Sequence, residues 1–155
     1  MRESLRLARL YMVLLAIFTV GRWVQGASGI PYERAHQVFS IVILTLLAAV
    51  FYGAFGRRWR RWRPAQAVLL GVTLGLSAQV VILLATVLSY ATGTDTYFNH
   101  SIALNASLPC EPPVDVPLAR ALTVRAGGLV FNTLATGIAG GLGWALGALL
   151  PEERA

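Results

Sequence analysis

The chain has no lysine and few charged residues of any kind. Its 155 residues include 13 arginines and 7 acidic residues, so charged residues make up only 13% of the sequence, while hydrophobic residues make up 56%. The mean hydropathy of +0.63 lies outside the range of an ordinary soluble domain. This composition excludes a water-soluble core and indicates an integral membrane protein. The absence of lysine is typical of a GC-rich bacterial genome.

Residues that support catalysis or metal binding are scarce as well. The single cysteine, Cys110, cannot form a disulfide within the chain, which excludes a thiol oxidoreductase with a Cys-x-x-Cys pair. The sequence has no phosphate-binding P-loop, no His-Glu-x-x-His zinc helix and no Gly-x-Ser-x-Gly elbow. We therefore assign no catalytic residue and no metal site. Three roles stay open for Cys110: a buried spectator, an intermolecular bridge or a metal ligand.

Four apolar segments reach the roughly 20 residues that a helix needs to cross a bilayer. The predicted spans are residues 7–23, 35–55, 67–90 and 126–149. We predict an all-α integral membrane protein in which four transmembrane helices form a bundle, as a single domain over residues 1–155. A long outer loop, residues 91–118, then joins the third span to the fourth.

The arginines predict the orientation of these spans, because arginines beside a hydrophobic span resist translocation and stay in the cytoplasm. With both termini cytoplasmic, nine arginines fall inside and four outside. The inner ones are Arg2, Arg6, Arg9, Arg57, Arg58, Arg60, Arg61, Arg63 and Arg154, and the outer ones are Arg22, Arg34, Arg120 and Arg125. We therefore expect a multi-pass protein of the bacterial cytoplasmic (inner) membrane.

Five arginines between the second and third spans form the densest charged run in the chain. They are Arg57, Arg58, Arg60, Arg61 and Arg63. Two tryptophans lie among them at the depth of the lipid headgroups, where basic side chains attract anionic lipid. We predict that this run binds anionic phospholipids. Nucleic-acid binding is not expected, because the basic residues bracket apolar spans.

Small residues in the third and fourth spans predict close helix packing, since helices in lipid are held together by backbone approach and polar contacts. The predicted packing residues are Gly71, Gly75, Gly137, Gly141, Gly143 and Gly147. Two interpretations are open: these rows pack within the chain, or they dock a second protein. Because the glycines exceed what one short bundle needs, we expect a homo-oligomer or a larger membrane complex.

Two amides lie within predicted spans, Gln79 near the middle of the third and Asn132 in the outer half of the fourth. Leaving such a group unpaired in hydrocarbon costs several kcal/mol, so each needs a partner. The partner is either another helix or a substrate or quinone. No ionisable residue is predicted in the middle of a span, which disfavours an ion-coupled pump.

The predicted outer loop is far longer than a tight hairpin requires. It contains His100, the aromatic pair Tyr97 and Phe98, and four prolines that restrict its backbone. We expect the aromatic rings to rest on the bilayer surface or on the bundle. The sequence therefore predicts a lid or a docking loop on the outer side.

Glu33 and His36 lie three residues apart at the predicted outer end of the second span. Residues at this spacing share a helix face, so the carboxylate could orient the imidazole or join it on a metal. The alternative is local: Pro31 suits the first helical position, and an acid in the first turn favours the positive end of the helix dipole.

Residues 21–29, Gly-Arg-Trp-Val-Gln-Gly-Ala-Ser-Gly, followed by Glu33-x-x-His36, resemble the first hairpin of heme A synthases. The resemblance covers about 30 of the 155 residues and implies His36 as an axial heme ligand and Glu33 as a catalytic or propionate-proximal acid. The chain departs from that family because its first outer loop has no cysteine pair and its fourth span has no histidine. His100 replaces the missing ligand only if its loop folds back over the bundle.

Three classes of function remain. The first is a non-catalytic polytopic protein that acts as an accessory, assembly or interaction subunit of a membrane complex. The second is a redox protein that binds heme, quinone or metal through Glu33, His36 and His100. The third is a small oligomeric permease with Gln79 and Asn132 along its path. The sequence requires no cofactor, and it favours the first class.

Overall fold

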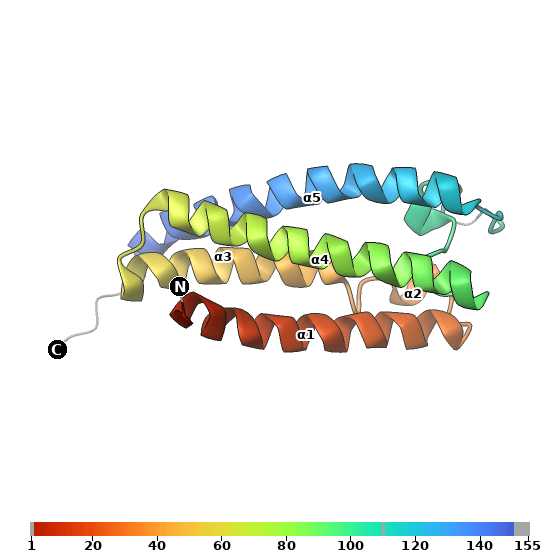
Figure 1. Ribbon diagram of the computed structural model, residues 1–155, viewed down its shortest axis with the longest axis horizontal. Helices are drawn as coiled ribbons and strands as arrows, with labels where there is room; N and C mark the ends of the chain where they lie inside the picture. The colour runs from red at the N-terminus through yellow and green to blue at the C-terminus, as the bar shows by residue number, and fades with distance from the viewer. Residues whose placement is uncertain (1, 110, 151–155) are drawn as a thin grey trace. The chain divides into compact units, whose positions relative to one another are not determined.

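The computed structural model describes residues 2–109 and 111–150, with side chains from residue 8 onward, and every regular element in this part of the chain is a helix (Figure 1). The elements in chain order are α1 (Arg2–Ala27), α2 (Tyr32–Ala35), α3 (Ile41–Arg60), α4 (Pro64–Thr92), the 3-10 helix η1 (Ile102–Leu104), α5 (Leu118–Leu146) and the 3-10 helix η2 (Gly147–Leu149). The predicted all-α class is confirmed. Cys110 and Arg154 lie outside the described residues, as do the side chains of Arg2 and Arg6.

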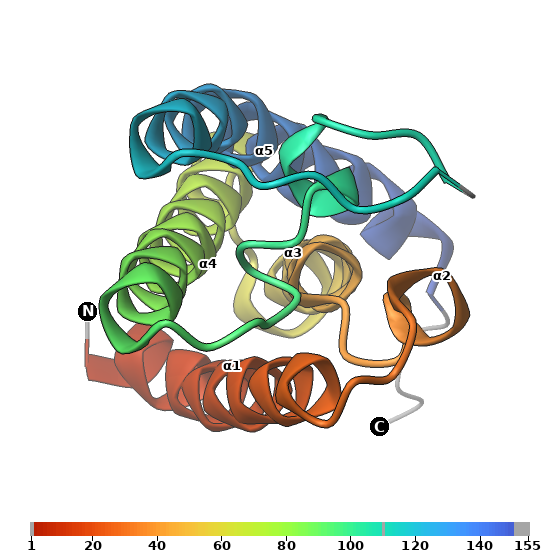
Figure 2. The ribbon, with the colours of Figure 1, turned by 90° about the vertical axis from the view of Figure 1, so that its right-hand side faces the viewer.

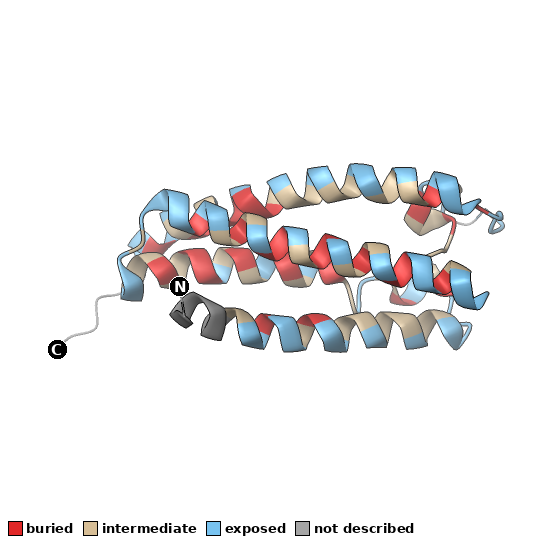
Figure 3. Ribbon diagram, viewed as in Figure 1, coloured by how far each residue is buried: buried red, intermediate tan, exposed pale blue. Residues whose placement is uncertain are grey.

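Four of these helices are long and apolar enough to cross a membrane, as predicted. The candidate spans are Ala8–Ala27, Ile41–Arg60, Pro64–Thr92 and Leu118–Leu149. Many of their large apolar side chains are exposed (Figure 3). In the candidate span of α1, only 11% of the apolar 18-residue segment is buried. Hydrocarbon accepts such surfaces and water does not. These features are those of a multi-pass membrane protein.

Contacts along the chain define two compact units. The first holds Met1–Ile41 with Ala78–Leu129, and the second holds Val42–Ser77 with Val130–Ala155. The first unit thus contains α1, α2, the last part of α4, the first part of α5 and residues 93–117, which we call the long loop. The second unit contains most of α3, the first part of α4 and the last part of α5.

The second long helix begins later than the predicted span 35–55. Tyr32–Ala35 form the separate helix α2, and α3 starts after an intervening turn. The Arg22 guanidinium donates a hydrogen bond of 2.8 Å to the main-chain oxygen of His36, and the Ser40 amide, which a continuous helix would direct to that oxygen, donates instead to the Gln37 oxygen at 3.2 Å. Glu33 and His36 therefore lie in and directly after α2 and not at the start of the long helix.

The last long helix begins earlier than the predicted span 126–149. It starts directly after Pro117, whose main-chain oxygen accepts a hydrogen bond of 3.1 Å from the Ala121 amide. A proline suits this position because the first turn of a helix leaves its amides without helical partners. Arg125 consequently lies inside α5, where the apolar pattern alone had excluded it from the span.

Glycines end both α1 and α4. Gly29 has a φ of +70° and Gly93 has a φ of +63°, a region that glycine enters without a steric penalty. After α4, the Gly93 amide donates to the Tyr90 oxygen at 3.3 Å and the Thr94 amide donates to the Ser89 oxygen at 3.1 Å. This is the Schellman arrangement, and it fixes the point at which the long loop leaves the helix.

In the second unit, glycines of α5 bring its backbone close to α3. A Cβ atom built on Gly143 would overlap the main chain of Val50, and one built on Gly147 would meet the main chain of Ala54. A backbone cannot rotate out of the way as a flexible side chain can. These two glycines therefore set how closely α3 and α5 approach.

Glycines also bring α4 close to α5 in the same unit. Gly71 and Gly75 both face Thr136, and a Cβ atom on either would overlap atoms of that residue. Gly137 and Gly141 instead approach valine side chains of α4. The loss of stability on replacing a glycine with alanine should therefore differ from one glycine of α5 to the next.

Gly143→Ala should destabilise the protein, because the new methyl group overlaps main-chain atoms of α3. We expect a loss of about 2 kcal/mol in the free energy of unfolding, as is typical of overpacked sites. Gly127→Ala in the same helix is the control, since its Cβ atom meets nothing within 4 Å. Thermal unfolding in one detergent compares the two. Equal midpoints would show that this glycine face contributes little to packing.

Candidate functional site

The long loop is folded against the helices of the first unit. Phe98 is only 1% exposed, and Tyr97 and Leu104 are also buried. Leu104 packs with Val116 and Ala121, where α5 begins. Figure 2 shows the loop leaving α4, folding back and continuing into the start of α5. Of the two placements expected for Tyr97 and Phe98, the bilayer surface or the bundle, their burial corresponds to the second.

Arg22 of α1 lies under this loop, and three aromatic rings surround it. The distances from its Cζ atom to the ring centroids are 5.7 Å for Tyr32, 5.6 Å for Tyr97 and 5.8 Å for Phe98. Its NH2 group also donates a 3.3 Å hydrogen bond to the Tyr32 hydroxyl. Aromatic faces attract a guanidinium group, most strongly where water is excluded. Arg22 thus links α1 to α2 and to the long loop.

Arg125 of α5 holds the same loop through its backbone. Its NH2 group donates a hydrogen bond of 2.6 Å to the main-chain oxygen of Phe98, and its Nε donates one of 3.1 Å to the Thr86 hydroxyl. Phe98 is therefore held twice: Arg22 contacts the ring and Arg125 contacts the carbonyl. A hydrogen bond from a charged donor is about twice as strong as a neutral one.

Neither guanidinium forms an ion pair with an acidic side chain in the part of the chain that the structure describes. In the sequence, Arg22 and Arg125 served only as markers of orientation, and their role in holding the long loop was not predicted. One signal was present in the sequence: the predicted orientation puts these two arginines on the outer side, against the positive-inside bias, and such a position calls for a structural reason.

Polar contacts fix the turn that carries Phe98. The Ser89 hydroxyl of α4 and the Thr96 hydroxyl lie 2.7 Å apart, and the Thr96 amide donates a 2.8 Å hydrogen bond to the Asn99 side-chain oxygen. On the other side, a Cβ atom on Gly26 would overlap the backbone of Thr96, so α1 approaches the turn closely. The loop is thus inserted between the ends of α1 and α4.

Tyr32 stacks on both histidines of the chain. The centroid distance is 5.1 Å to the His36 ring and 4.8 Å to the His100 ring, and the rings are nearly parallel, at 13° and 14°. The loop therefore folds back far enough to bring His100 to α2. The exposed side chain of Glu33 lies on the same short helix.

Stacking on Tyr32 does not itself engage the nitrogens that would bind iron, because their lone pairs lie in the plane of the ring. His36 Nδ1 lies 3.0 Å from the main-chain oxygen of Tyr32. The assignment of Glu33, His36 and His100 to a cofactor stays a prediction.

His100 is poised as a neutral group at the loop. Burial lowers the pKa of its imidazole, although the carboxylates of Glu33 and Asp95 partly offset this effect. The Ile102 amide donates a 3.3 Å hydrogen bond to Nδ1, so the proton of the neutral ring lies on Nε2. Burial likewise raises the pKa of the Tyr97 hydroxyl, which donates to the Ile30 oxygen at 2.8 Å.

A cavity of about 640 Å³ lies between the long loop and the ends of α1 and α4. Its lining includes the three tyrosines Tyr32, Tyr90 and Tyr97, together with His100. His36 and Glu33 are not part of this lining. A cavity of this size falls in the range that holds small molecules in proteins.

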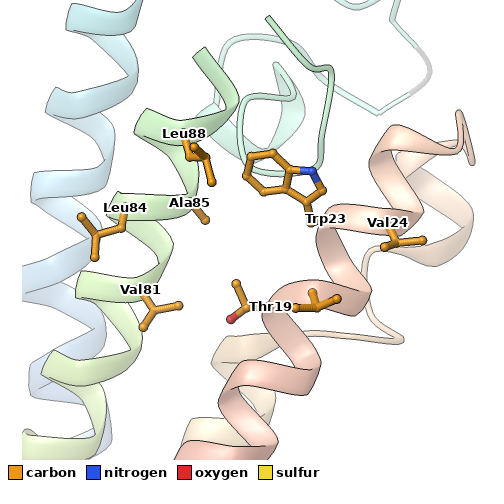
Figure 4. Close-up of a pocket in the computed structure, with 8 residues that line it drawn as sticks. Thr19, Trp23, Val24, Val81, Leu84, Ala85 and Leu88 are labelled. Carbon is orange, nitrogen blue, oxygen red and sulfur yellow. The ribbon is translucent and has the colours of Figure 1, made fainter. Parts of the chain in front are cut away.

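A second cavity, of about 380 Å³, lies between α1 and α4 and is almost wholly apolar (Figure 4). Trp23 of α1 and Leu84 and Leu88 of α4 are among its walls. The one hydroxyl in its wall, on Thr19, donates to the Leu15 oxygen at 2.7 Å. This cavity therefore offers a guest hydrocarbon contact and little else.

The arginine run ends α3 with a compact turn in the second unit. The Arg57 guanidinium lies 4.1 Å from the ring centroid of Trp144, and the Trp144 indole donates a 2.7 Å hydrogen bond to the Trp62 oxygen. Arg61 has a φ of +52° at the turn. Arg57 thus has a packing role beyond the predicted one, whereas Arg60, Arg61 and Arg63 are exposed.

The two predicted intramembrane amides differ in burial. Gln79 of α4 is 5% exposed, while Asn132 of α5 is half-buried and its main-chain oxygen accepts a 2.8 Å hydrogen bond from the Thr136 hydroxyl. The structure does not bring either into the lining of the two cavities above. Their contact with a substrate or quinone stays a prediction.

No family model, no curated protein and no solved structure matches the chain. The resemblance to heme A synthases therefore rests on residues 21–36 alone.

Arg22→Gln should release the long loop, because the three rings lose their cation and Tyr32 loses a donor. We expect amide exchange at Tyr97 and Phe98 to become about tenfold faster or more, since a desolvated cation–π contact contributes up to about 2 kcal/mol. Arg34→Gln is the control, as Arg34 is an exposed arginine of α2. Hydrogen exchange with mass spectrometry measures both. Identical protection in the two variants would contradict the role of Arg22.

The docked loop should loosen in mild acid. A lowered pKa means that His100 takes up a proton more readily when the loop is released, so stability is complete above about pH 6.5 and falls as pH drops toward the lowered value. Amide exchange of the loop at pH 7.5 and 5.5, corrected for the intrinsic rate, measures this slope. His100→Gln should remove this pH dependence of loop exchange, and His36→Gln should leave it unchanged. A slope that survives His100→Gln would assign the effect to another group.

Proposed function

We propose that the chain is a four-helix bundle of the bacterial cytoplasmic membrane, with both termini in the cytoplasm and the long loop outside, and that it acts as a non-catalytic accessory, assembly or interaction subunit of a membrane complex. The nine-to-four distribution of arginines supports this orientation. In this role the protein offers a fixed surface to a partner rather than a reacting group.

The observation that carries the proposal is the way in which the long loop is held. Its aromatic residues are buried, Arg22 and Arg125 fix Phe98 from two sides, and the Ser89–Thr96 contact anchors the turn. A flexible linker needs none of these contacts. A loop that presents one surface to another protein needs such contacts, because preorganisation lowers the entropic cost of binding.

The contact surface that we propose lies on the far part of the loop. Leu108 is 66% exposed and Val114 is 50% exposed, and several prolines lie near them. Outside the membrane, apolar side chains of this size mark interaction sites when they are grouped. Prolines keep such a segment extended and limit the entropy lost on binding.

A photoreactive amino acid at position 108, introduced in the native membrane, tests this function. We expect one discrete cross-linked protein partner and its loss when Val114 is replaced by Glu, because a charge in the contact opposes desolvation. Asn105→Asp adds the same charge at an exposed polar position of the loop and should leave the product unchanged. Failure to cross-link at 108, or a heme absorption band in the purified protein, would contradict the proposal.

We also propose that the arginine run binds anionic lipid at the cytoplasmic surface. Each basic side chain near an anionic surface contributes on the order of 1 kcal/mol. Replacing Arg60, Arg61 and Arg63 with Gln should therefore lower the amount of acidic phospholipid retained per protein through purification. The control removes equal charge from three other exposed arginines: Arg9, Arg34 and Arg120. Equal lipid content in both triple variants would leave the run as an orientation signal alone.

A further inference from the structure

The cavity under the long loop differs in charge from the rest of the chain. The chain carries 13 arginines and a net charge of +6, yet no arginine lines this cavity, while Asp95 and Asp115 do. Neither carboxylate forms an ion pair within the described residues. The only other titratable groups in its wall are tyrosines and His100, whose imidazole burial keeps neutral. The groups that line the cavity thus carry a net negative charge, while the Arg22 guanidinium lies against two of its tyrosines, Tyr32 and Tyr97.

The wall of the cavity is built and not merely a gap in a mobile loop. Ser89, Thr96 and Ser101 line it and are all buried. The Ser101 and Ser107 hydroxyls lie 2.7 Å apart, and the Tyr90 hydroxyl donates a 2.6 Å hydrogen bond to a main-chain oxygen of the loop. These contacts fix the hydroxyl groups of the wall before any ligand arrives, whereas the side chains of Asp95 and Asp115 are exposed.

The donors and acceptors of the wall define the ligand chemistry. Two carboxylates accept hydrogen bonds, and the Nε2 proton of His100 is available to donate one. Side chains such as Ile30 and Val116 add hydrocarbon to the same wall. A guest that matches all three features has a positive charge, a hydrogen-bond acceptor and an organic body.

A bare metal ion fits the site poorly. Hard cations such as Ca²⁺ take six or more oxygen ligands, and no group of three His, Cys, Asp or Glu side chains in the described part of the chain is arranged to hold a metal. An organic ammonium ion needs fewer fixed ligands, because its three protons are satisfied by two carboxylates and a hydroxyl or carbonyl.

We propose that this cavity binds a small organic ammonium ion between Asp95 and Asp115, with its hydrogen-bond acceptor toward His100. The ammonium group comes either from a free amine or from the headgroup of an aminophospholipid in the adjacent leaflet. The two sources share the same contacts. The site is complete within the first unit, so it does not depend on the partner proposed above.

Ethanolamine is the probe, and the purified full-length protein in phosphatidylglycerol nanodiscs is the receptor. Saturation-transfer NMR should detect saturable binding of ethanolamine and none of ethylene glycol, which has the same size and no charge. Asp95→Asn and Asp115→Asn should each weaken binding about tenfold or more, because each removes a charged hydrogen-bond partner. Glu111→Gln removes an acid from the same loop outside the cavity and should leave binding unchanged.

Nanodiscs that contain phosphatidylethanolamine distinguish the two sources. Weaker apparent binding of free ethanolamine in these discs supports a lipid headgroup as the occupant, and unchanged binding supports a free amine. The proposal is overturned if ethanolamine does not saturate in either disc, or if Glu111→Gln weakens binding as much as the two aspartate variants do. An unchanged thermal transition in all variants shows that the comparison is made on folded protein.

Discussion

Phe98 is the residue on which the first unit depends, because two arginines from different helices hold it. Arg22 contacts its ring and Arg125 contacts its carbonyl, and neither arginine has a carboxylate partner in the described chain. A guanidinium group stays charged at any physiological pH, so near hydrocarbon it must find oxygen atoms or aromatic faces. The long loop supplies both. The arginines therefore hold the loop in place, and the loop supplies the contacts that the two guanidinium groups need.

This requirement connects the packing of the unit to what it can do. With the loop fixed, its buried side brings Tyr97 and His100 to the cavity, and its exposed side has Leu108 and Val114. The helices of the second unit are held together differently. In lipid, burying apolar surface contributes little to helix association, and close approach of the backbones contributes more. Gly143 against Val50 is an example.

The sequence predicted the parts of the fold that depend on hydrophobic runs. The four long helices and the long loop after the third were expected, because length and hydropathy suffice for them. The start of α3 was not predicted correctly, because the turn after α2, where Arg22 binds the His36 oxygen across the hairpin, leaves no mark in the hydrophobic pattern. Likewise, the inclusion of Arg125 in α5 depends on a partner, Phe98, that is 27 residues away in sequence. Local patterns carry no information on such pairs. The cavity also could not be inferred, since its aspartates come from opposite ends of the loop.

The claim that the arginine-held loop faces the outside, with the arginine run in the cytoplasm, is tested most directly by thiol labelling. Single cysteines replace Glu111 and Arg63, both exposed, in a chain that carries Cys110→Ser. In intact cells a membrane-impermeant maleimide should label the cysteine at 111 and should reach the one at 63 only after permeabilisation. Labelling of position 63 in intact cells, with protection of position 111, would contradict the proposed orientation.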